Sequence, residues 1–493
     1  MTQEEFDVVV AGGGPAGSTV ATLVAMHNHR VLLLERERFP RYQIGESLLP
    51  ATVHGICVLL GVAEQLKEAN FVRKLGGTFR WGARAEPWTF TFGISSAMTG
   101  STAYAYQVER AKFDKILLDN AAHKGVDVRQ EHKVTEMIKE GERVTGVRFV
   151  GPDGVEGVAR ARFVVDATGN QSLIGRVAGE RVFSKFFQNL ALFCYFENGK
   201  RLPPPNNGNI LSVAFDSGWF WYIPLSETLT SVGAVISKEY AAQLRDAGGY
   251  EEAMRRFIAS CPLIAEYLAG ARRVTEGIYG QFRVRKDYSY CHSSFWYPGL
   301  VLVGDAACFV DPVFSSGVHL ATYSGLLAAR SINSTLRGDL DEELCFREFE
   351  LRYRKEYGNF YNFLIEFYDM NREWDSYFWT ARHILNTEER SNEAFVRLVA
   401  GVSTTGEPLY NSADEFFRAR ERASAFFPDS KDELETGEQS SILAGDVFSE
   451  ATRIQLQASL GANSRLETPL FSTGLVPSAD GLRWRKVKTA TAE

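Results

Sequence analysis

The sequence predicts an α/β (α+β) fold in which a buried parallel sheet, an antiparallel sheet and a C-terminal helical region share one chain of 493 residues. The first observation is an apolar, valine-rich run at residues 6–11, typical of a fully buried parallel strand. The second is strand-like alternation within residues 186–284. The third is a series of aromatic residues at helical spacing within residues 341–400. A chain of this length exceeds a single core, so several sub-domains are expected.

The first apolar run leads into a glycine-rich turn at residues 12–17 and then into a helical stretch and a second buried strand at residues 31–34. Gly12 permits the tight turn, Gly14 lets the backbone approach a pyrophosphate, and Gly17 allows close packing of helix and strand. An acidic residue closes the second strand, where it can accept hydrogen bonds from ribose hydroxyls. The pattern predicts a Rossmann-type dinucleotide site. Its expected residues are Gly12, Gly14, Pro15, Ala16, Gly17 and Glu35.

Two later segments extend this pattern. Residues 163–169 read as a buried strand that ends in a turn of small residues, and residues 300–303 form a strand that leads to Asp305. We expect Asp305 to cap its turn and to bind the ribityl chain of a flavin. The helix that begins at Gly317 and Val318 would direct its positive end at the flavin ring. The alternative is an ordinary βα unit with an aspartate cap.

Together these segments resemble the FAD-binding fold of the para-hydroxybenzoate hydroxylase class. Arg110, which opens the motif at residues 110–114, stands where that class places an arginine in contact with FAD, and Ser47 is a further expected FAD contact. Only one glycine-rich turn opens a strand–helix unit, and nothing else resembles a nicotinamide site. The resemblance therefore implies a flavin that arrives already reduced, as FADH2, from a separate flavin reductase.

The stretch Trp219-Phe220-Trp221-Tyr222-Ile223-Pro224 places two indoles on one face of a predicted strand. Trp219, Trp221 and Ile223 would form a rigid apolar wall, with Pro224 at its end. Beside a flavin, such a wall would keep an organic substrate away from the ring while small ions pass. The alternative is a well-packed central strand with no further role.

These residues resemble the flavin-dependent halogenases, and in particular the branch that acts on phenols and on substrates bound to carrier proteins. The stretch at residues 219–224 fits that family's WxWxIP signature, and residues 45–50 resemble its GES(L)LP segment. The resemblance covers roughly residues 5–400 and places the catalytic lysine of the family at Lys74.

In that family, reduced FAD and O2 oxidise a bound chloride or bromide to hypohalous acid, which passes through a tunnel to the lysine and halogenates an electron-rich ring. The resemblance implies a halide site at the backbone N–H groups of Ser316 and Gly317. Lys74 would act either neutral, forming a chloramine, or charged, hydrogen bonding to the acid, and the sequence leaves both open. Glu46 is a candidate supporting carboxylate near Lys74, with hydrogen bonding in the flavin loop as the alternative.

One departure from the family bears on the substrate. The tryptophan-halogenating branch carries a glutamate in the loop just before the halide site, where this chain has Phe314. The missing acid argues against free tryptophan and for a phenol, which activates its own ring. We therefore expect a phenolic ring tethered to an acyl or peptidyl carrier protein in natural-product biosynthesis. The alternatives are a flavin-dependent aromatic hydroxylase of the same fold and a non-catalytic flavin-binding subunit.

Composition excludes several other classes of function. The net charge is −7 and no block of lysine or arginine is present, which argues against nucleic acid as a partner. No apolar run approaches the ~18 residues of a membrane-spanning helix, and the acidic N-terminus does not resemble a signal peptide. The six cysteines have neither CxxC nor metal-type spacing, which predicts reduced, mostly buried thiols and no metal site. These features predict a cytoplasmic protein.

We expect the chain to be organised in four parts. A discontinuous FAD-binding domain would comprise residues 1–185 and 285–340, and an antiparallel substrate layer residues 186–284. A helical region at residues 341–400 would pack its aromatic face on the flavin domain, with a substrate pocket as the alternative. A loosely ordered tail at residues 401–493 would set the width of the substrate entrance if it folds over the core.

Overall fold

The fold is described from a computed structural model. It covers residues 3–403 and 469–487, apart from residues 84, 96–97, 99, 172–174, 241–243, 245–247, 287–288, 370–373 and 386–389. Contacts divide the chain into two units, Met1–Ser403 and Thr404–Glu493. In the second unit, β22 (Leu475–Pro477) pairs antiparallel with β23 (Trp484–Lys486). Most of the predicted tail lies outside the described residues.

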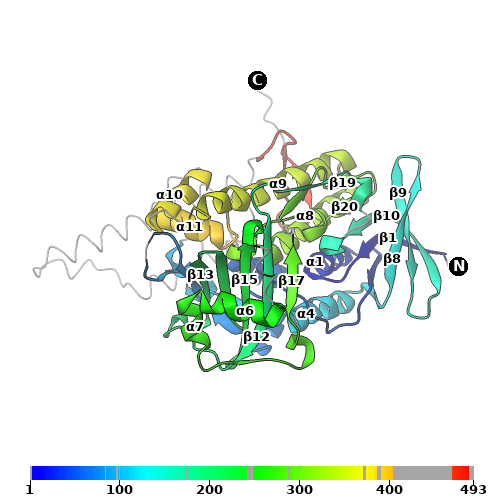
Figure 1. The fold of residues 1–493 in the computed structure, drawn as a ribbon. Coiled ribbons are helices and arrows are strands. Elements are labelled where there is room, and N and C mark those ends of the chain that lie inside the picture. The colour runs from blue at the N-terminus through cyan, green and yellow to red at the C-terminus, as the bar shows by residue number, and fades with distance from the viewer. Residues whose placement is uncertain are drawn as a thin grey trace, which may run out of the picture. The chain divides into compact units, whose positions relative to one another are not determined.

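The first sheet confirms the predicted parallel strands. Its order is β19-β20-β10-β1-β2-β7. Strand β1 pairs parallel with both β2 and β10, β2 with β7, and β10 with β20. A hairpin of β8 and β9 pairs antiparallel with the first half of β10 and extends at one edge of the sheet (Figure 1). The strands are β1 (Gln3–Ala11), β2 (Val31–Glu35), β7 (Asp127–Gln130), β8 (Lys133–Glu140), β9 (Arg143–Val150), β10 (Glu156–Asp166), β19 (Trp296–Tyr297) and β20 (Leu300–Leu302).

Three helices pack near the glycine-rich turn. They are α1 (Pro15–Ala25), α4 (Arg110–His123) and α8 (Gly317–Arg337). Helix α1 is buried along its whole length and lies beside α8, as Figure 1 shows. A Cβ on Gly325 of α8 would lie 3.0 Å from the Ala16 carbonyl oxygen, so the two helices approach closely. The start of α1 therefore lies against α8 at Gly325.

The second sheet confirms the predicted antiparallel layer. Its order is β16-β12-β15-β14-β13-β4-β5, with β17 also paired to β12, and all pairs are antiparallel except β13 with β4. Helices α6 (Tyr250–Ala259) and α7 (Pro262–Leu268) cover one face. The strands are β4 (Gly76–Arg80), β5 (Trp88–Thr91), β12 (Asn189–Glu197), β13 (Ile210–Phe215), β14 (Gly218–Pro224), β15 (Leu229–Ser237), β16 (Arg272–Arg273) and β17 (Arg283–Lys286).

The indole stretch forms β14, in the middle of this sheet, and its two faces differ. Phe220 and Tyr222 belong to the core beneath α6 and α7. Trp219, Trp221 and Ile223 point to the opposite face, as the period of two along a strand requires. The antiparallel sheet therefore offers one apolar face to the space between it and the first sheet.

The helical region consists of α9 (Glu342–Phe367), α10 (Trp374–Leu385) and α11 (Ser391–Val399). Near the start of α9, Phe346 packs on Phe163 of β10, with ring centroids 5.5 Å apart. Near its end, Phe367 stacks on Trp81 at 4.8 Å and contacts Phe79 of β4 at 5.4 Å. The second half of α9 also contacts the flavin domain, where Phe360 packs on His319 of α8. The expected packing is thus confirmed, and only the end of α9 packs on the antiparallel sheet.

Shorter elements complete the first unit. They are the helices α2 (Cys57–Leu60) and α3 (Ala63–Glu68), a π-helical turn at Ala51–Ile56, and the strands β3 (Val72–Lys74), β6 (Ala105–Gln107), β11 (Arg181–Phe183), β18 (Tyr290–His292) and β21 (Cys308–Phe309). All six cysteine thiols are free, and five are buried, as predicted. Within the described part of the chain, no helix combines the length and apolar character needed to cross a bilayer.

We predict that Gly17→Ala destabilises the protein by about 2 kcal/mol or more and weakens FAD binding. The added Cβ would lie 1.9 Å from the Gly12 carbonyl oxygen, so the glycine-rich turn would have to shift. Thermal unfolding with and without FAD measures the effect. Gly358→Ala in α9 is the control, because its Cβ would meet open space and should stabilise the helix by up to about 1 kcal/mol. Wild-type stability and FAD affinity in Gly17→Ala would contradict the prediction.

Candidate functional site

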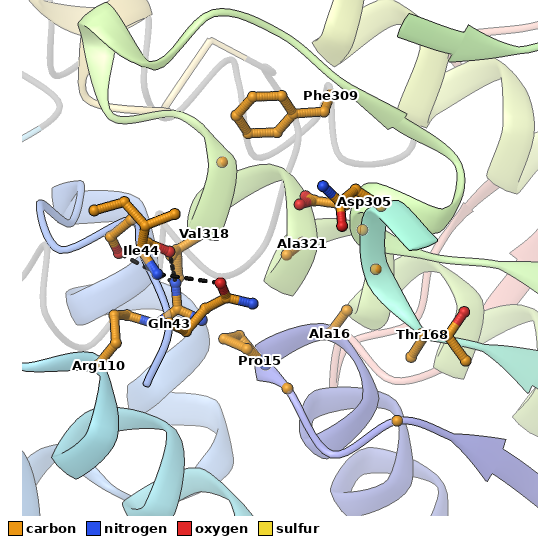
Figure 2. A pocket seen from close by; sticks show the side chains of 18 of the residues that line it. Pro15, Ala16, Gln43, Ile44, Arg110, Thr168, Asp305, Phe309, Val318 and Ala321 are labelled. Atoms are coloured by element: carbon orange, nitrogen blue, oxygen red, sulfur yellow. Dashed lines mark hydrogen bonds between the residues drawn. The ribbon is translucent and has the colours of Figure 1, made fainter. Parts of the chain in front are cut away.

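A cavity of about 570 Å³ lies where the carboxyl ends of β1, β2 and β10 face the inner side of the antiparallel sheet. This is the edge at which parallel α/β sheets bind ligands. In Figure 2, Arg110 lies beside Ile44 on one side of the cavity, Asp305 lies on the other, and Pro15 marks the start of α1 between them. The structure therefore brings most of the predicted FAD residues to one space.

The nucleotide end of the cavity fits a dinucleotide. Gly14 is the N-cap of α1, with no side chain capping the helix, so the N–H groups of the first turn remain for a phosphate. The Glu35 carboxylate accepts from the backbone N–H of Gly13 at 2.6 Å and of Glu37 at 2.8 Å, and it lies in the cavity wall. Several basic side chains line the same space and suit a pyrophosphate. They are Arg36, Arg41, Arg110, Lys133 and Arg285.

Arg110 fixes the loop that carries Glu46 and Ser47. Its guanidinium pairs with both carboxylate oxygens of Asp114, at 2.7 and 2.9 Å, and donates to the Ile44 carbonyl at 2.7 Å. Gly45 has a φ of +103°, and a Cβ there would lie 2.9 Å from the Arg110 Nη1 atom. The loop thus turns tightly over the arginine. Arg110 lines the cavity, where FAD contact was expected.

The flavin end of the cavity holds Asp305 and the start of α8. Asp305 lies in the short 3₁₀ turn Gly304–Ala306 but does not cap it as expected, because the N-cap is Val303 and no side chain caps the turn. Burial raises the pKa of the Asp305 carboxyl to about 6, with Arg110 opposing the rise. Gly317 and Val318 line the cavity at the first turn of α8. Buried N–H groups and an acceptor therefore surround the place expected for the flavin ring and ribityl chain.

Residues 311–317, here called the 311–317 turn, connect β21 to α8. Asp311 is fully buried and caps a 3₁₀ turn at Pro312–Phe314 by accepting from the Val313 N–H at 3.0 Å. Burial raises the pKa of the Asp311 carboxyl to about 6. Ser315 then takes the left-handed conformation, with a φ of 60°, and Ser316 is the N-cap of α8. The Ser316 hydroxyl is buried without a hydrogen-bond partner in the structure. This polar, positive helix start could receive a small anion.

Trp219, Trp221 and Ile223, here called the indole wall, line the large cavity from the antiparallel sheet. The Trp219 indole donates to the Tyr368 hydroxyl at 2.7 Å, and the Trp221 indole donates to the Ser231 hydroxyl at 3.2 Å. Both indoles are at least 95% buried. Their orientation is therefore fixed by packing and by a polar contact each. Pro224 is buried at the end of the strand but does not line the cavity.

Lys74 lies at the end of β3, and only 3% of it is exposed. Its Nζ atom donates to the Ser47 hydroxyl at 2.9 Å and to the Leu48 carbonyl at 3.1 Å. Burial lowers the pKa of this amine to about 7, because no carboxylate among the described residues compensates the loss of hydration. Near neutral pH, both the neutral and the charged form are therefore populated.

Lys74 also borders a second, small cavity of about 10 Å³. Its other walls are mostly apolar, and Phe314 packs there against Phe79 with ring centroids 5.9 Å apart. Ile210 and Ser315 line both cavities. The two cavities thus share two lining residues, and Ser47, which lines the large cavity, contacts the amine.

Glu46 faces the large cavity. Its Oε1 atom accepts from the Tyr195 hydroxyl at 2.7 Å, and the Tyr195 hydroxyl lies 2.7 Å from that of Tyr42. Burial raises the pKa of the Glu46 carboxyl to about 7, with Ser231 and Tyr195 hydrogen bonds opposing the rise. Among the described residues the hydrogen bonds of Lys74 go to Ser47 and Leu48, whereas those of the Glu46 side chain go to Tyr195 of β12 and Ser231 of β15.

Sequence reasoning missed several residues that shape this site. Asp311 was not among the predicted site residues, although an aspartate before a proline-led turn is a recognisable cap signal. Ile210 is one apolar residue of a strand pattern, and nothing in that pattern predicts that it lines both cavities. Tyr368 and Tyr195 act through contacts to residues more than a hundred positions away, which no local pattern reveals.

The fold and the large cavity are those of an FAD-binding enzyme, and a second cavity beside Lys74 has room for about one water. A family model described as tryptophan halogenase matches residues 7–101 and 95–431. The chain is 34% identical over 434 residues to the tryptophan 2-halogenase of Chondromyces crocatus, which covers 86% of this chain and 80% of that protein. It therefore belongs to the flavin-dependent halogenase family.

Two further relatives refine this likeness. A 1H-pyrrole-2-carbonyl peptidyl-carrier-protein chlorinase of Pseudomonas fluorescens is 31% identical over 393 residues, covering 75% of this chain and 85% of its own. The structure of the myxobacterial chondrochloren halogenase is 56% identical, covers 98% of this chain and 100% of its own, and superposes with a TM-score of 0.75. The halogenases in this family halogenate aromatic substrates and use FAD.

The buried amine predicts a pH-dependent difference in stability. Because the pKa of Lys74 falls from 10.5 to about 7 on folding, the unfolded chain binds more protons between those values, and stability rises with pH across that window. Lys74→Met should therefore stabilise the protein near pH 7, on the order of 1–3 kcal/mol, and this gain should shrink towards pH 10.

Thermal unfolding of the flavin-free protein across this pH range measures the effect. Lys67→Met is the matched control, because Lys67 lies on the surface of α3 and pairs with exposed Glu64. The control should show no comparable pH-dependent gain. A difference between Lys74→Met and wild type that stays constant with pH would show that the amine is not buried as described.

Proposed function

We propose that this protein is an FADH2- and O2-dependent halogenase that chlorinates or brominates a phenolic ring tethered to a carrier protein, through hypohalous acid and Lys74. The observation that carries the proposal is the pair of cavities that share Ile210 and Ser315, because the buried amine of Lys74 borders only the smaller one. The family relationship favours this activity over the hydroxylase alternative.

The residues around the large cavity would hold the cofactor. The first turn of α1 and the basic side chains would bind the pyrophosphate, Glu35 the ribose, and Asp305 the ribityl chain. Ser47, held by the Arg110-anchored loop, and Val318 would contact the flavin. When bound, reduced FAD supplies the electrons with which O2 is activated. The protein's own part is to orient the flavin and to exclude organic substrate from its ring.

The halide would bind at the 311–317 turn. Ser316 and Gly317 present backbone N–H groups at the start of a long helix, and the partnerless Ser316 hydroxyl can donate a further hydrogen bond. The indole wall lines the same cavity. Its apolar face would prevent bulky molecules from approaching, while a halide and its oxidised form remain small enough to pass.

Lys74 would receive the hypohalous acid in the second chamber. The charged amine can hydrogen-bond the acid, and the neutral amine can form a chloramine. A pKa near 7 makes both available at neutral pH. The apolar surroundings of the amine would protect the oxidant from water. Ser47, which contacts Lys74 and lines the flavin cavity, would orient the amine.

Phe314, which stands where the tryptophan-halogenating branch has a glutamate, supports a phenol as substrate. Phe314 is 4% exposed and packs among Phe79, Phe363 and Phe367, so no carboxylate can occupy that place. A phenol supplies its own ring activation by ionising or by donating its proton. The carrier-protein chlorinase among the relatives supports a tethered substrate. A cytoplasmic location with a separate flavin reductase as partner is part of this proposal.

The activity can be reconstituted with the purified protein, FAD, a flavin reductase, NADH and chloride or bromide. A tyrosine-derived phenol would be offered free and as a thioester on a carrier protein, with free tryptophan as a third arm. We expect the halogen isotope pattern in the mass of the carrier-bound phenol. Halogenated tryptophan alone would overturn the substrate assignment, and a gain of oxygen without halogen would favour a hydroxylase.

Lys74→Ala should reduce halogenation by at least about a hundredfold, because general acid–base groups commonly contribute that much. Flavin oxidation and release of peroxide should stay at the wild-type level, since Lys74 lies outside the large cavity. Product mass and peroxide are measured in the same reaction. The control Lys67→Ala removes an exposed lysine nearby in the sequence. Unchanged halogenation by Lys74→Ala would remove this lysine from the mechanism.

A further inference from the structure

The indole wall and the 311–317 turn share one hydrogen-bond partner. The Tyr368 hydroxyl accepts a hydrogen bond from the Trp219 indole at 2.7 Å and donates one to the Asp311 carboxylate at 2.5 Å. Tyr368 is the C-cap of α9, so three segments distant in the sequence meet at a single oxygen atom. The contact joins the two sides of the cavity through the protein.

Asp311 connects the Tyr368 hydroxyl to the backbone of the 311–317 turn. One of its oxygens accepts from the Val313 N–H at 3.0 Å, and the other accepts from Tyr368 and from the Asn189 amide at 3.2 Å. Because the Asp311 carboxylate is fully buried, each of its hydrogen-bond donors stabilises the charged form. The 3₁₀ turn that Asp311 caps is followed by Ser315, which lines both cavities.

Packing fixes the position of the Tyr368 ring. Its centroid lies 5.7 Å from that of Trp81, 5.3 Å from that of Phe187 and 6.3 Å from that of Phe186. A ring held on several sides keeps its hydroxyl in one place. The hydroxyl can therefore fix the distance between the Trp219 indole and the Asp311 carboxylate.

We propose that Tyr368 is a positioning residue that sets the separation between the indole wall and the 311–317 turn, and thereby the halide site and the passage past Ser315. This inference rests on the proposed function. Loss of the hydroxyl leaves the buried Trp219 N–H without that acceptor and Asp311 without one donor. The wall and the turn would then relax independently, so halide binding would weaken and oxidised halide would escape before it reaches Lys74.

The test compares Tyr368→Phe with Tyr361→Phe. Tyr361 lies one to two turns earlier on α9, and its hydroxyl lies 3.0 Å from that of Ser184, so the control removes one hydroxyl from the same helix. Bromide is titrated into each protein loaded with oxidised FAD, and the visible difference spectrum of the flavin reports binding. We expect the bromide Kd of Tyr368→Phe to rise about five- to tenfold, the factor that one lost hydrogen bond gives.

Turnover provides a second readout. In Tyr368→Phe the KM for bromide should rise by the same factor, and at saturating bromide the halogenated product per flavin oxidised should fall at least about threefold. FAD affinity should match the control, while the melting temperature should fall by a few degrees because two buried groups each lose a hydrogen-bond partner. A general loss of stability would not produce this combination of weaker halide binding and poorer coupling with unchanged flavin oxidation.

The outcomes separate this inference from the proposed function. If wild-type protein binds bromide but halogenates no phenol, the proposed function fails, and the bromide Kd values still decide the role of Tyr368. Equal Kd values and equal coupling in the two variants overturn the inference. If Tyr368→Phe is unstable, Trp219→Phe removes the same hydrogen bond from its other end. An unchanged bromide Kd in that variant also overturns the inference.

Discussion

Burial of the Lys74 amine is the constraint on which the rest of the candidate site depends. An amine with little access to water must either lose its proton or find acceptors, and here it has the Ser47 hydroxyl and the Leu48 carbonyl but no carboxylate. Those two acceptors belong to the loop that Arg110 anchors on α4. The position of the amine therefore depends on the FAD-binding part of the fold, although the amine lies outside the flavin cavity.

Loss of hydration on burial also governs the carboxylates around the flavin cavity. Glu46, Asp305 and Asp311 all have pKa values raised by burial, and each is held by donors from distant parts of the chain or by nearby arginines. Such groups are costly to bury unless their partners are in place. They consequently favour one arrangement of the loops that border the cavity. In this way a large fold determines the relative positions of a few polar atoms.

Much of the fold could be predicted from the sequence because its signals are local. The glycine-rich turn, the buried strands and the alternating indoles of β14 each follow from a period of a few residues. Lys74 was located by a motif, but its burial comes from Ser47, Phe92 and other residues brought together only by folding. Tyr368 was predicted as one member of an aromatic helix face, while its hydrogen bonds depend on a helix end meeting a strand 149 positions away. A sequence pattern predicts the individual helices and strands, but the contacts between distant elements are seen only in the folded structure.

Ile210 and Ser315 border both the flavin cavity and the small cavity at Lys74. Ser315 also adopts a left-handed backbone conformation, which few side chains tolerate well. A redesign of the enzyme for larger aromatic rings would enlarge the chamber at Lys74, and these two residues are among the obvious choices. Any change there would alter the compartment next to the flavin as well. The range of accepted substrates and the retention of the oxidant are therefore coupled. Substitutions at Phe90 or Val399, which line only the small cavity, would enlarge it without altering the wall of the flavin cavity.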